Sequence, residues 1–370
     1  MKHFWKMLTI VINVVPNPVG RFLTLFRREP AVETSSYTTT ESETVTMRIY
    51  HPEKLKNAPA LILYPGITPA AEEHEAVNML ARATALAGVR TFLPRIPYMK
   101  EVLVREESIE HMINVYETVE MREDIDKERI ACVGMSFGGS LFVKACLDER
   151  LKNRPASVIS YGSYFDFKES LQFAITGRCS DGKKEYVFEP HHWGRIVFFH
   201  NYLEYLDNPC NPENIRAYLL DQVANDGENG DELYAAFPEE DKILIDKIVS
   251  DQSKEVVEMV QQVMDKIENI LLPLSPIQFL DEIDFPLYLI HGASDTMIPF
   301  TETVRFRRAL EERGKEVHTF ISTLYAHSEI ERYGKGLLGL ISELWRMGCL
   351  LYTSDAADDT PCVDLGGRRI

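Results

Sequence analysis

Short apolar runs recur along the chain and predict a series of β-strands. Residues 44–51 (TVTMRIYH) alternate polar and apolar side chains, as a strand buried on one face does. The runs ALILY and IACV are apolar at every position, which predicts strands buried on both faces. The runs that we interpret as further strands are residues 60–64, 89–93, 130–133, 158–161, 286–290 and 317–321.

Segments with helical spacing separate these strands. Residues 72–87, for example, are followed by Gly88, and glycine commonly ends helices. Strands that alternate with helices of this length form parallel sheets. We therefore expect an α/β fold with a mostly parallel central sheet and helices on both faces. The segments predicted to be helical are residues 72–87, 106–121, 141–148, 301–313 and 329–346.

The pattern changes between residues 166 and 280. This stretch has clustered aromatic residues, an acidic turn at 225–232 and helical spacing from 239 to 271. We interpret it as a mostly helical insertion that caps the C-terminal edge of the sheet. Its aromatic residues predict an apolar pocket wall, and the alternative is that they only pack the cap on the core. The expected organisation is residues 1–43 (N-terminal helix and polar linker), 44–165 and 281–348 (core), 166–280 (cap) and 349–370 (non-native or disordered tail).

The two ends of the chain lie outside the predicted core. The apolar stretch at 7–15 is shorter than the roughly 20 residues that a membrane-spanning helix needs, so we expect a helix packed on the core. The alternative is an interfacial helix that contacts a membrane through residues 4–26. Residues 33–44 (ETSSYTTTESET) are polar and are expected to form a linker. The final residues, 349–370, closely resemble translated sequencing-adapter DNA at the end of a metagenomic read. We therefore expect the natural sequence to be cut off before them, and an ordinary disordered tail is the alternative.

Composition narrows the possible functions. The chain has 40 Lys and Arg against 57 Asp and Glu, and a surface with a net charge of −17 repels nucleic-acid phosphates. None of the six cysteines belongs to a Cys-x-x-Cys pair or has zinc-ligand spacing. We therefore expect no nucleic-acid partner, no metal and no disulfide framework, and a reducing compartment, the cytoplasm. Residues 225–232 are acidic but lack the spacing of a calcium loop.

The strongest chemical signal is Gly134-Met135-Ser136-Phe137-Gly138, which follows a buried strand and opens a helix. A serine on so tight a turn needs small neighbours two residues away on each side, and Gly134 and Gly138 meet that need. The helix N-terminus then presents free N–H groups to a developing oxyanion. We interpret Ser136 as a nucleophile. The alternative is a turn serine that caps the helix.

Two later residues complete a candidate catalytic triad. Asp295 lies in the turn after the strand PLYLI, where a carboxylate can orient a base, and the alternative is an aspartate that only stabilises its turn. His327 lies in the loop after the strand VHTFI. The resulting order, Ser then Asp then His, is the one that a serine elbow predicts. Asp166, after the preceding strand, is a rival acid, and His291 is assigned a structural role at its strand end.

With these motifs the chain resembles the α/β-hydrolases over residues 45–165 and 280–346, and GMSFGG, HGASD and YAHS carry the resemblance. The resemblance implies that Ser136 attacks an acyl carbon, His327 takes its proton and Asp295 holds His327. It also implies an oxyanion hole formed by the N–H groups of Phe137 and Ile67. Many relatives have His-Gly before the second donor, whereas this chain has Pro-Gly, which puts the identity of that donor in doubt.

The function expected from these residues is hydrolysis of a carboxylic ester, or of a thioester or amide, through an acyl-serine intermediate and without a cofactor. An apolar small-molecule acyl substrate is the expected partner. An acyltransferase or a peptidase with the same triad remains an alternative. A second alternative, from another class, is a non-catalytic binding or membrane-associated protein on a hydrolase scaffold.

Overall fold

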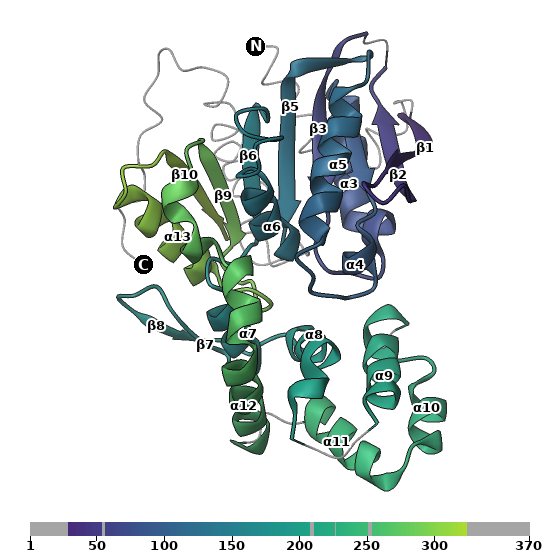
Figure 1. Cartoon of the computed structure of the whole chain (residues 1–370), viewed down its shortest axis with the longest axis vertical. Helices are drawn as coiled ribbons and strands as arrows, with labels where there is room; N and C mark the ends of the chain where they lie inside the picture. Colours follow the sequence, from purple (N-terminus) through teal and green to yellow (C-terminus); the bar gives the residue numbers. More distant parts are fainter. Residues whose placement is uncertain (1–28, 54–55, 208–210, 226, 251–253, 324–370) are drawn as a thin grey trace.

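An eight-stranded sheet in the order β1-β2-β4-β3-β5-β6-β9-β10 organises the structure (Figure 1). All strands from β3 onwards in this sheet run parallel, whereas β2 is antiparallel to both of its neighbours. The computed structural model describes residues 29–53, 56–207, 211–225, 227–250 and 254–323. The strands are β1 (Ala31–Thr38), β2 (Thr44–His51), β3 (Ala58–Tyr64), β4 (Arg90–Pro94), β5 (Ile125–Met135), β6 (Ser157–Tyr161), β9 (Leu287–Gly292) and β10 (Val317–Ser322).

Helices cover both faces of this sheet, as the apolar runs predict. Neighbouring residues of a strand point to opposite faces, so a strand buried on both sides is apolar throughout. In β3, Ile62 packs in the main hydrophobic cluster with α5, α6 and α13, whereas Leu63 packs against Ala81 and Ala85 of α3 on the other face. The helices of the core are η1 (Ala71–Glu73), α3 (Glu75–Leu86), α4 (Pro97–Lys100), α5 (Ser108–Glu120), α6 (Phe137–Ala145) and α13 (Phe300–Glu311).

The strand order contains a switch point between β3 and β5. The chain passes from β3 to β4 on one side and then crosses to β5 on the other side, so the loops after β3 and β5 diverge. In open α/β sheets a crevice forms at such a point, outside the carboxyl ends of the strands, and ligands bind there. The residues that follow β3 and β5 are Pro65 and Ser136.

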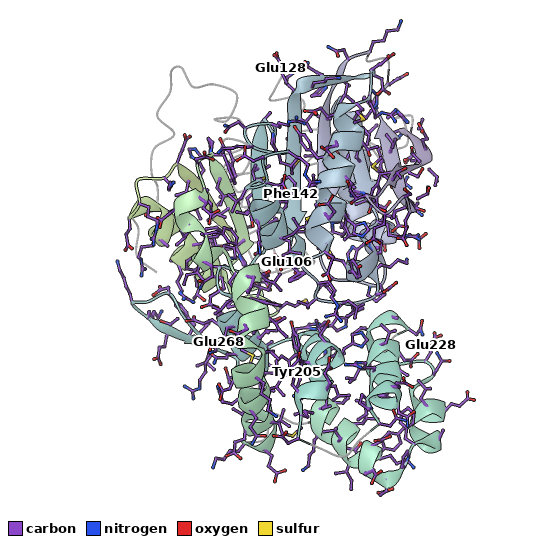
Figure 2. The ribbon with its side chains drawn as sticks, viewed as in Figure 1. Glu106, Glu128, Phe142, Tyr205, Glu228 and Glu268 are labelled. Atoms are coloured by element: carbon purple, nitrogen blue, oxygen red, sulfur yellow. The ribbon has the colours of Figure 1, made fainter. Side chains whose placement is uncertain are left out.

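The segment between β6 and β9, called the helical insertion below, lies beyond the C-terminal ends of the parallel strands (Figure 1). Figure 2 shows Tyr205, Glu228 and Glu268 in this part of the molecule, away from Glu128 at the far end of β5. Within the stretch 239–271 the described residues form two helices, α11 and α12, and residues 251–253 lie outside the described part of the chain. The elements are α7 (Phe167–Thr176), β7 (Arg178–Ser180), β8 (Glu185–Val187), α8 (His192–Tyr202), η2 (Leu203–Tyr205), α9 (Pro212–Ala224), α10 (Gly230–Ala236), α11 (Glu239–Ser250), α12 (Lys254–Leu271), η3 (Leu272–Leu274), η4 (Pro276–Gln278) and η5 (Leu280–Glu282).

The interpretation of residues 33–44 as a polar linker is wrong, because most of them belong to the hairpin of β1 and β2. Ala31 pairs with His51 and Thr38 with Thr44 in an antiparallel register. Of the residues of β1, Tyr37 alone is fully buried, and its hydroxyl donates to the Arg95 carbonyl at 2.8 Å. Because Tyr37 anchors this edge strand, the other residues of the strand need not be apolar. Its threonines favour the extended backbone of a strand.

Several sequence expectations lie outside the described residues. They are the N-terminal helix with its membrane alternative at 4–26, the last helix at 329–346, the tail at 349–370 and the candidate base His327. Within the part of the chain that the structure describes, no helix has the length and apolar character required to cross a membrane.

Candidate active site

Ser136 occupies the turn between β5 and α6 in a backbone conformation that side chains rarely adopt. Its φ of 52° and ψ of −130° lie outside the favoured regions for a residue other than glycine. The turn is fixed by two backbone hydrogen bonds, from Ser136 N–H to the Tyr161 carbonyl at 2.8 Å and from Gly139 N–H to the Ser136 carbonyl at 3.0 Å. The Ser136 side chain makes no capping hydrogen bond to α6. The side-chain hydrogen bond that would make Ser136 a cap of α6 is therefore absent at this residue.

The glycines of the motif are required by close packing around this turn. A Cβ on Gly134 would lie 2.6 Å from the Cα of Gly139, and one on Gly138 would lie 2.1 Å from the Pro65 carbonyl oxygen. Real Cβ atoms do not approach other heavy atoms so closely. The spacing read from the sequence is thus a steric requirement of this elbow.

Residues 65–69, called the β3 loop below, lie directly against Ser136. A Cβ on Gly66 would be 2.8 Å from the Cβ of Ser136 and 3.4 Å from its Oγ. Ile67 is the residue after Gly66, and Phe137, the residue after Ser136, is the first residue of α6. The N–H groups of Ile67 and Phe137 are the predicted oxyanion donors, and their role remains a prediction.

Asp295 lies in the loop after β9 and is 1% exposed. Its Oδ1 accepts from the N–H groups of Met297 at 2.9 Å and Ile298 at 3.0 Å, which are the bonds of a turn-stabilising aspartate. Its Oδ2 lies 3.3 Å from His291 Nε2. One oxygen therefore builds the turn, and the carboxylate is held in a fixed orientation at the end of β9.

His291 is fully buried and links the Asp295 loop to α13. Its Nε2 lies 2.9 Å from the Ile298 carbonyl, and its Nδ1 lies 2.8 Å from Thr303 Oγ1. A carbonyl only accepts, so Nε2 carries a proton that it donates to the Ile298 carbonyl, and Nδ1 shares a hydrogen bond with the Thr303 hydroxyl. The same Nε2–H faces Oδ2 of Asp295. The predicted structural role of His291 thus includes bracing the candidate acid, and no pattern in the sequence pointed to its partner Thr303.

The rival acid, Asp166, is engaged as the N-cap of α7. Its Oδ1 accepts from Lys168 N–H at 3.0 Å, and its own N–H donates to Glu302 Oε2 at 2.7 Å. Glu302 also accepts from Phe165 N–H at 2.9 Å. Burial raises the pKa of Glu302 to about 7, although Arg305 acts in the opposite direction. Sequence reasoning missed Glu302, since an acidic residue in the first turn of a helix usually signals only a favourable helix dipole.

Sheet order brings the segments after β5, β9 and β10 to one edge. Strands β5, β6, β9 and β10 are consecutive neighbours and parallel, so the segments after them emerge on the same side. Ser136 follows β5 and Asp295 follows β9, while the described chain ends at Thr323, just after β10 and shortly before His327. Ala293 N–H donates to the Ser322 carbonyl at 2.7 Å, which ties the Asp295 loop to the end of β10.

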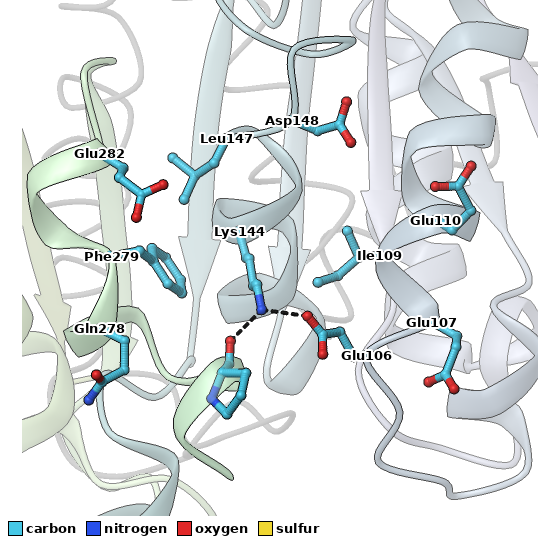
Figure 3. Close-up of a pocket in the computed structure, with 11 residues that line it drawn as sticks. Glu106, Glu107, Ile109, Glu110, Lys144, Leu147, Asp148, Gln278, Phe279 and Glu282 are labelled. Atoms are coloured by element: carbon cyan, nitrogen blue, oxygen red, sulfur yellow. Dashed lines mark hydrogen bonds and ion pairs between the residues drawn. The ribbon is translucent and has the colours of Figure 1, made fainter. Parts of the chain in front are cut away.

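A groove of about 740 Å³ lies elsewhere, between α5, α6 and the segment after α12 (Figure 3). Its central cation, Lys144, bonds Glu106 at 2.6 Å and the Pro273 carbonyl at 2.5 Å. Two of its carboxylates, Glu110 and Asp148, pair with Arg150. None of the predicted site residues lines this groove. Among the described residues, no cluster of His, Cys, Asp and Glu is arranged to hold a metal ion.

A second cavity, of about 620 Å³, adjoins the Asp295 loop. Thr296 forms part of its wall and accepts a hydrogen bond from His191 N–H at 2.9 Å. His192 and Arg195 line it as well, and burial, together with the Arg195 charge, lowers the pKa of His192. The described lining of this cavity is mostly polar. Several aromatic residues between 161 and 205 lie in the main hydrophobic cluster: Tyr164, Phe165, Phe167, Phe198, Phe199 and Tyr202. The apolar pocket wall remains a prediction.

Comparison with solved structures defines the fold. The acylaminoacyl peptidase of Pyrococcus horikoshii matches 95% of this chain with a TM-score of 0.52 at 16% identity, and the match covers 46% of that protein. Dipeptidyl peptidase 4 of Porphyromonas gingivalis matches 92% with a TM-score of 0.51 at 12% identity, covering 38% of its chain. A puromycin hydrolase matches 89% with a TM-score of 0.52 at 12% identity, covering 40% of its chain.

These matches, with the sheet order and the elbow, show that the chain has the α/β-hydrolase fold, as the sequence motifs predicted. The chain spans less than half the length of each of these three proteins. No family model matches the chain, and neither does any curated protein.

Proposed function

We propose that this chain is a serine hydrolase that cleaves a carboxylic ester through an acyl intermediate on Ser136. The observation that carries the proposal is the contact between the elbow and the β3 loop. Ser136 is held at a φ of 52°, and Gly66 is in direct contact with it. A strained backbone at a turn of this kind is a known feature of functional sites. Here the strained residue is followed directly by Phe137, one candidate donor, and is in contact with Gly66, which precedes Ile67, the other.

In the proposed acylation step, His327 takes the proton of Ser136 Oγ while a bond forms between Oγ and the acyl carbon. The carbonyl oxygen becomes an oxyanion, which accepts hydrogen bonds from the N–H groups of Phe137 and Ile67. The intermediate then collapses, the bond to the leaving oxygen breaks, and the imidazolium protonates that oxygen. Asp295 holds the imidazole in the tautomer that accepts the first proton.

In the proposed deacylation step, a water molecule adds to the acyl carbon and gives its proton to His327. The bond between the carbon and Ser136 Oγ then breaks, and the proton returns to Oγ. The products are a carboxylic acid and the free serine, so the cycle consumes one water and needs no oxidant, reductant or cofactor.

Peptide hydrolysis is the second candidate. Two of the similar solved structures are peptidases, and the same serine chemistry cleaves amides. An acyltransferase would differ only in the acceptor that replaces water. Matched ester and amide substrates distinguish these candidates.

Turnover of matched substrates tests the proposal. Wild type and Ser136→Ala are each given p-nitrophenyl esters of increasing acyl length and an N-acyl amino-acid p-nitroanilide. We expect ester hydrolysis that depends on Ser136 and exceeds anilide hydrolysis. Faster cleavage of the anilide would establish the peptidase instead. A folded wild-type protein with no Ser136-dependent turnover of either class would contradict both candidates.

A further inference from the structure

Asn201, on α8 of the helical insertion, connects the insertion to the core through two buried hydrogen bonds. Its Oδ1 accepts from Val104 N–H at 2.7 Å, and its Nδ2 donates to the Val102 carbonyl at 2.9 Å. The second Nδ2 proton serves the Val197 carbonyl of α8, also at 2.9 Å. Asn201 is 4% exposed. An amide is the side chain that both donates and accepts, so Asn201 fixes both ends of this turn at once.

The turn that Asn201 holds contains a strained residue. Val102 has a φ of 62° and is fully buried. Positive φ is a genuine outlier for a β-branched side chain, and such a conformation persists only when surrounding contacts impose it. The Asn201 bonds hold the carbonyl of this strained residue and the N–H of Val104, two residues further on. The helical insertion thus imposes the shape of a turn that belongs to the core.

The same turn supports the β3 loop. Val102 N–H donates to the Met99 carbonyl of α4 at 3.3 Å, and that carbonyl also accepts from Thr68 N–H at 3.1 Å. Lys100 Nζ, also on α4, donates to the Pro69 carbonyl at 3.3 Å. Thr68 immediately follows Ile67, the candidate second oxyanion donor. A continuous set of bonds therefore runs from Asn201 through α4 to the loop that touches Ser136.

We propose that Asn201 is a positioning residue for the β3 loop, so that the helical insertion sets the geometry of the oxyanion hole. This role rests on the proposed function. Asn201 touches no reacting atom, and it acts through the turn at Val102 and through α4. Loss of its amide leaves Val104 N–H and the Val102 carbonyl without their partners in a buried place, and the turn relaxes to recover them. Thr68 then shifts, and the Ile67 N–H loses its aim at the oxyanion.

The expected signature is a selective loss of transition-state binding. An oxyanion donor acts after the carbonyl oxygen becomes charged, so its displacement lowers kcat and leaves KM unchanged. We expect kcat of Asn201→Leu to fall about 10- to 100-fold, part of the loss seen when such a donor is removed outright. A boronic acid, which forms a tetrahedral adduct on the serine, should lose affinity by the same factor. Asn201→Ala, which introduces no bulk, provides a second variant if the leucine disturbs folding.

Ser275→Ala is the matched control. Ser275 is also a buried polar residue of the insertion and accepts from Phe167 N–H at 3.0 Å, but both partners belong to the insertion and this bond does not lead towards the β3 loop. It should lose thermal stability and keep kcat and boronic-acid affinity.

Two results would overturn the role of Asn201 and remain distinguishable from failure of the proposed function. Ser136-dependent turnover with unchanged kcat in the folded Asn201 variants would refute the positioning role alone. A fall in kcat without a parallel loss of boronic-acid affinity would do the same. Absence of any Ser136-dependent turnover in wild type would refute the proposed function and this role together.

Discussion

Gly66 and Ser136 are in contact across the switch point of the sheet, at a distance that leaves no room for a side chain on position 66. A Cβ there would lie 2.8 Å from the Cβ of Ser136 and 3.2 Å from the carbonyl oxygen of Met135. The β3 loop can therefore reach the serine only because it carries glycine. This steric requirement explains the glycine at position 66.

Gly66→Ala should damage turnover more than stability. The added methyl must push the β3 loop away from Ser136, and with it the candidate donor Ile67. We expect kcat to fall about 100-fold, the scale of one lost oxyanion donor. The control is Gly314→Ala, where φ is +65° but no atom lies within 4 Å of the new Cβ. That variant should lower the free energy of unfolding by about 1 kcal/mol and keep full activity. Equal activity in both variants would contradict the role of the β3 loop.

Asn substitutions should separate the two candidate acids. Asp166 caps α7, and asparagine caps helices as well as aspartate does, so Asp166→Asn should retain both stability and turnover. Asp295→Asn should retain its turn through Oδ1 but lose the charge that orients and stabilises an imidazolium. We expect its kcat to fall about 10⁴-fold. Measured kcat values that reverse this order would assign the acid to Asp166.

Glu302 should make stability depend on pH. Burial raises its pKa from 4.5 to about 7, so the folded state favours the protonated carboxyl. The stabilisation from this proton is complete below pH 4.5, and it is lost as the pH rises to 7. In the wild-type protein, the contribution of this proton to the free energy of unfolding therefore falls by roughly 3 kcal/mol across that window. Glu302→Gln carries no titrating proton, so urea unfolding should show a smaller loss of stability over the same range.

The control for this pH effect is Glu312→Gln, an exposed change just after the same helix, which should retain the wild-type slope. Arg305 and Glu169 also face Glu302 and contribute to the pH dependence. The slope of unfolding free energy against pH is therefore compared between the variants and the wild-type protein. Identical slopes for wild type and Glu302→Gln would contradict the assigned pKa.

The parts of the fold that were predictable are those set by local patterns. A strand buried on both faces must be apolar throughout, so the run ALILY was enough to predict β3. The turn at Ser136 could be predicted because Gly134 and Gly138 meet a steric requirement that arises close to them in the chain. The strand β1 was missed because an edge strand anchored by Tyr37 needs no apolar periodicity.

The parts that were not predictable depend on contacts between distant residues. Glu302 is buried because the N–H groups of Phe165 and Asp166 need an acceptor, and nothing in the local sequence of α13 signals this. Asn201 likewise reads as an ordinary polar residue of α8, although its partners lie about 100 residues earlier in the chain. Tertiary hydrogen bonds of this kind leave no periodic trace in a sequence.

Covalent labelling of Ser136 tests the central claim most directly. A fluorophosphonate probe reacts only with a serine whose proton is taken by a base and whose adduct is stabilised by an oxyanion hole. Intact mass and peptide mapping of the labelled wild-type protein should place one adduct on Ser136, and Ser136→Ala should remain unlabelled. A folded wild-type protein that stays unmodified, or an adduct on another residue, would contradict the account.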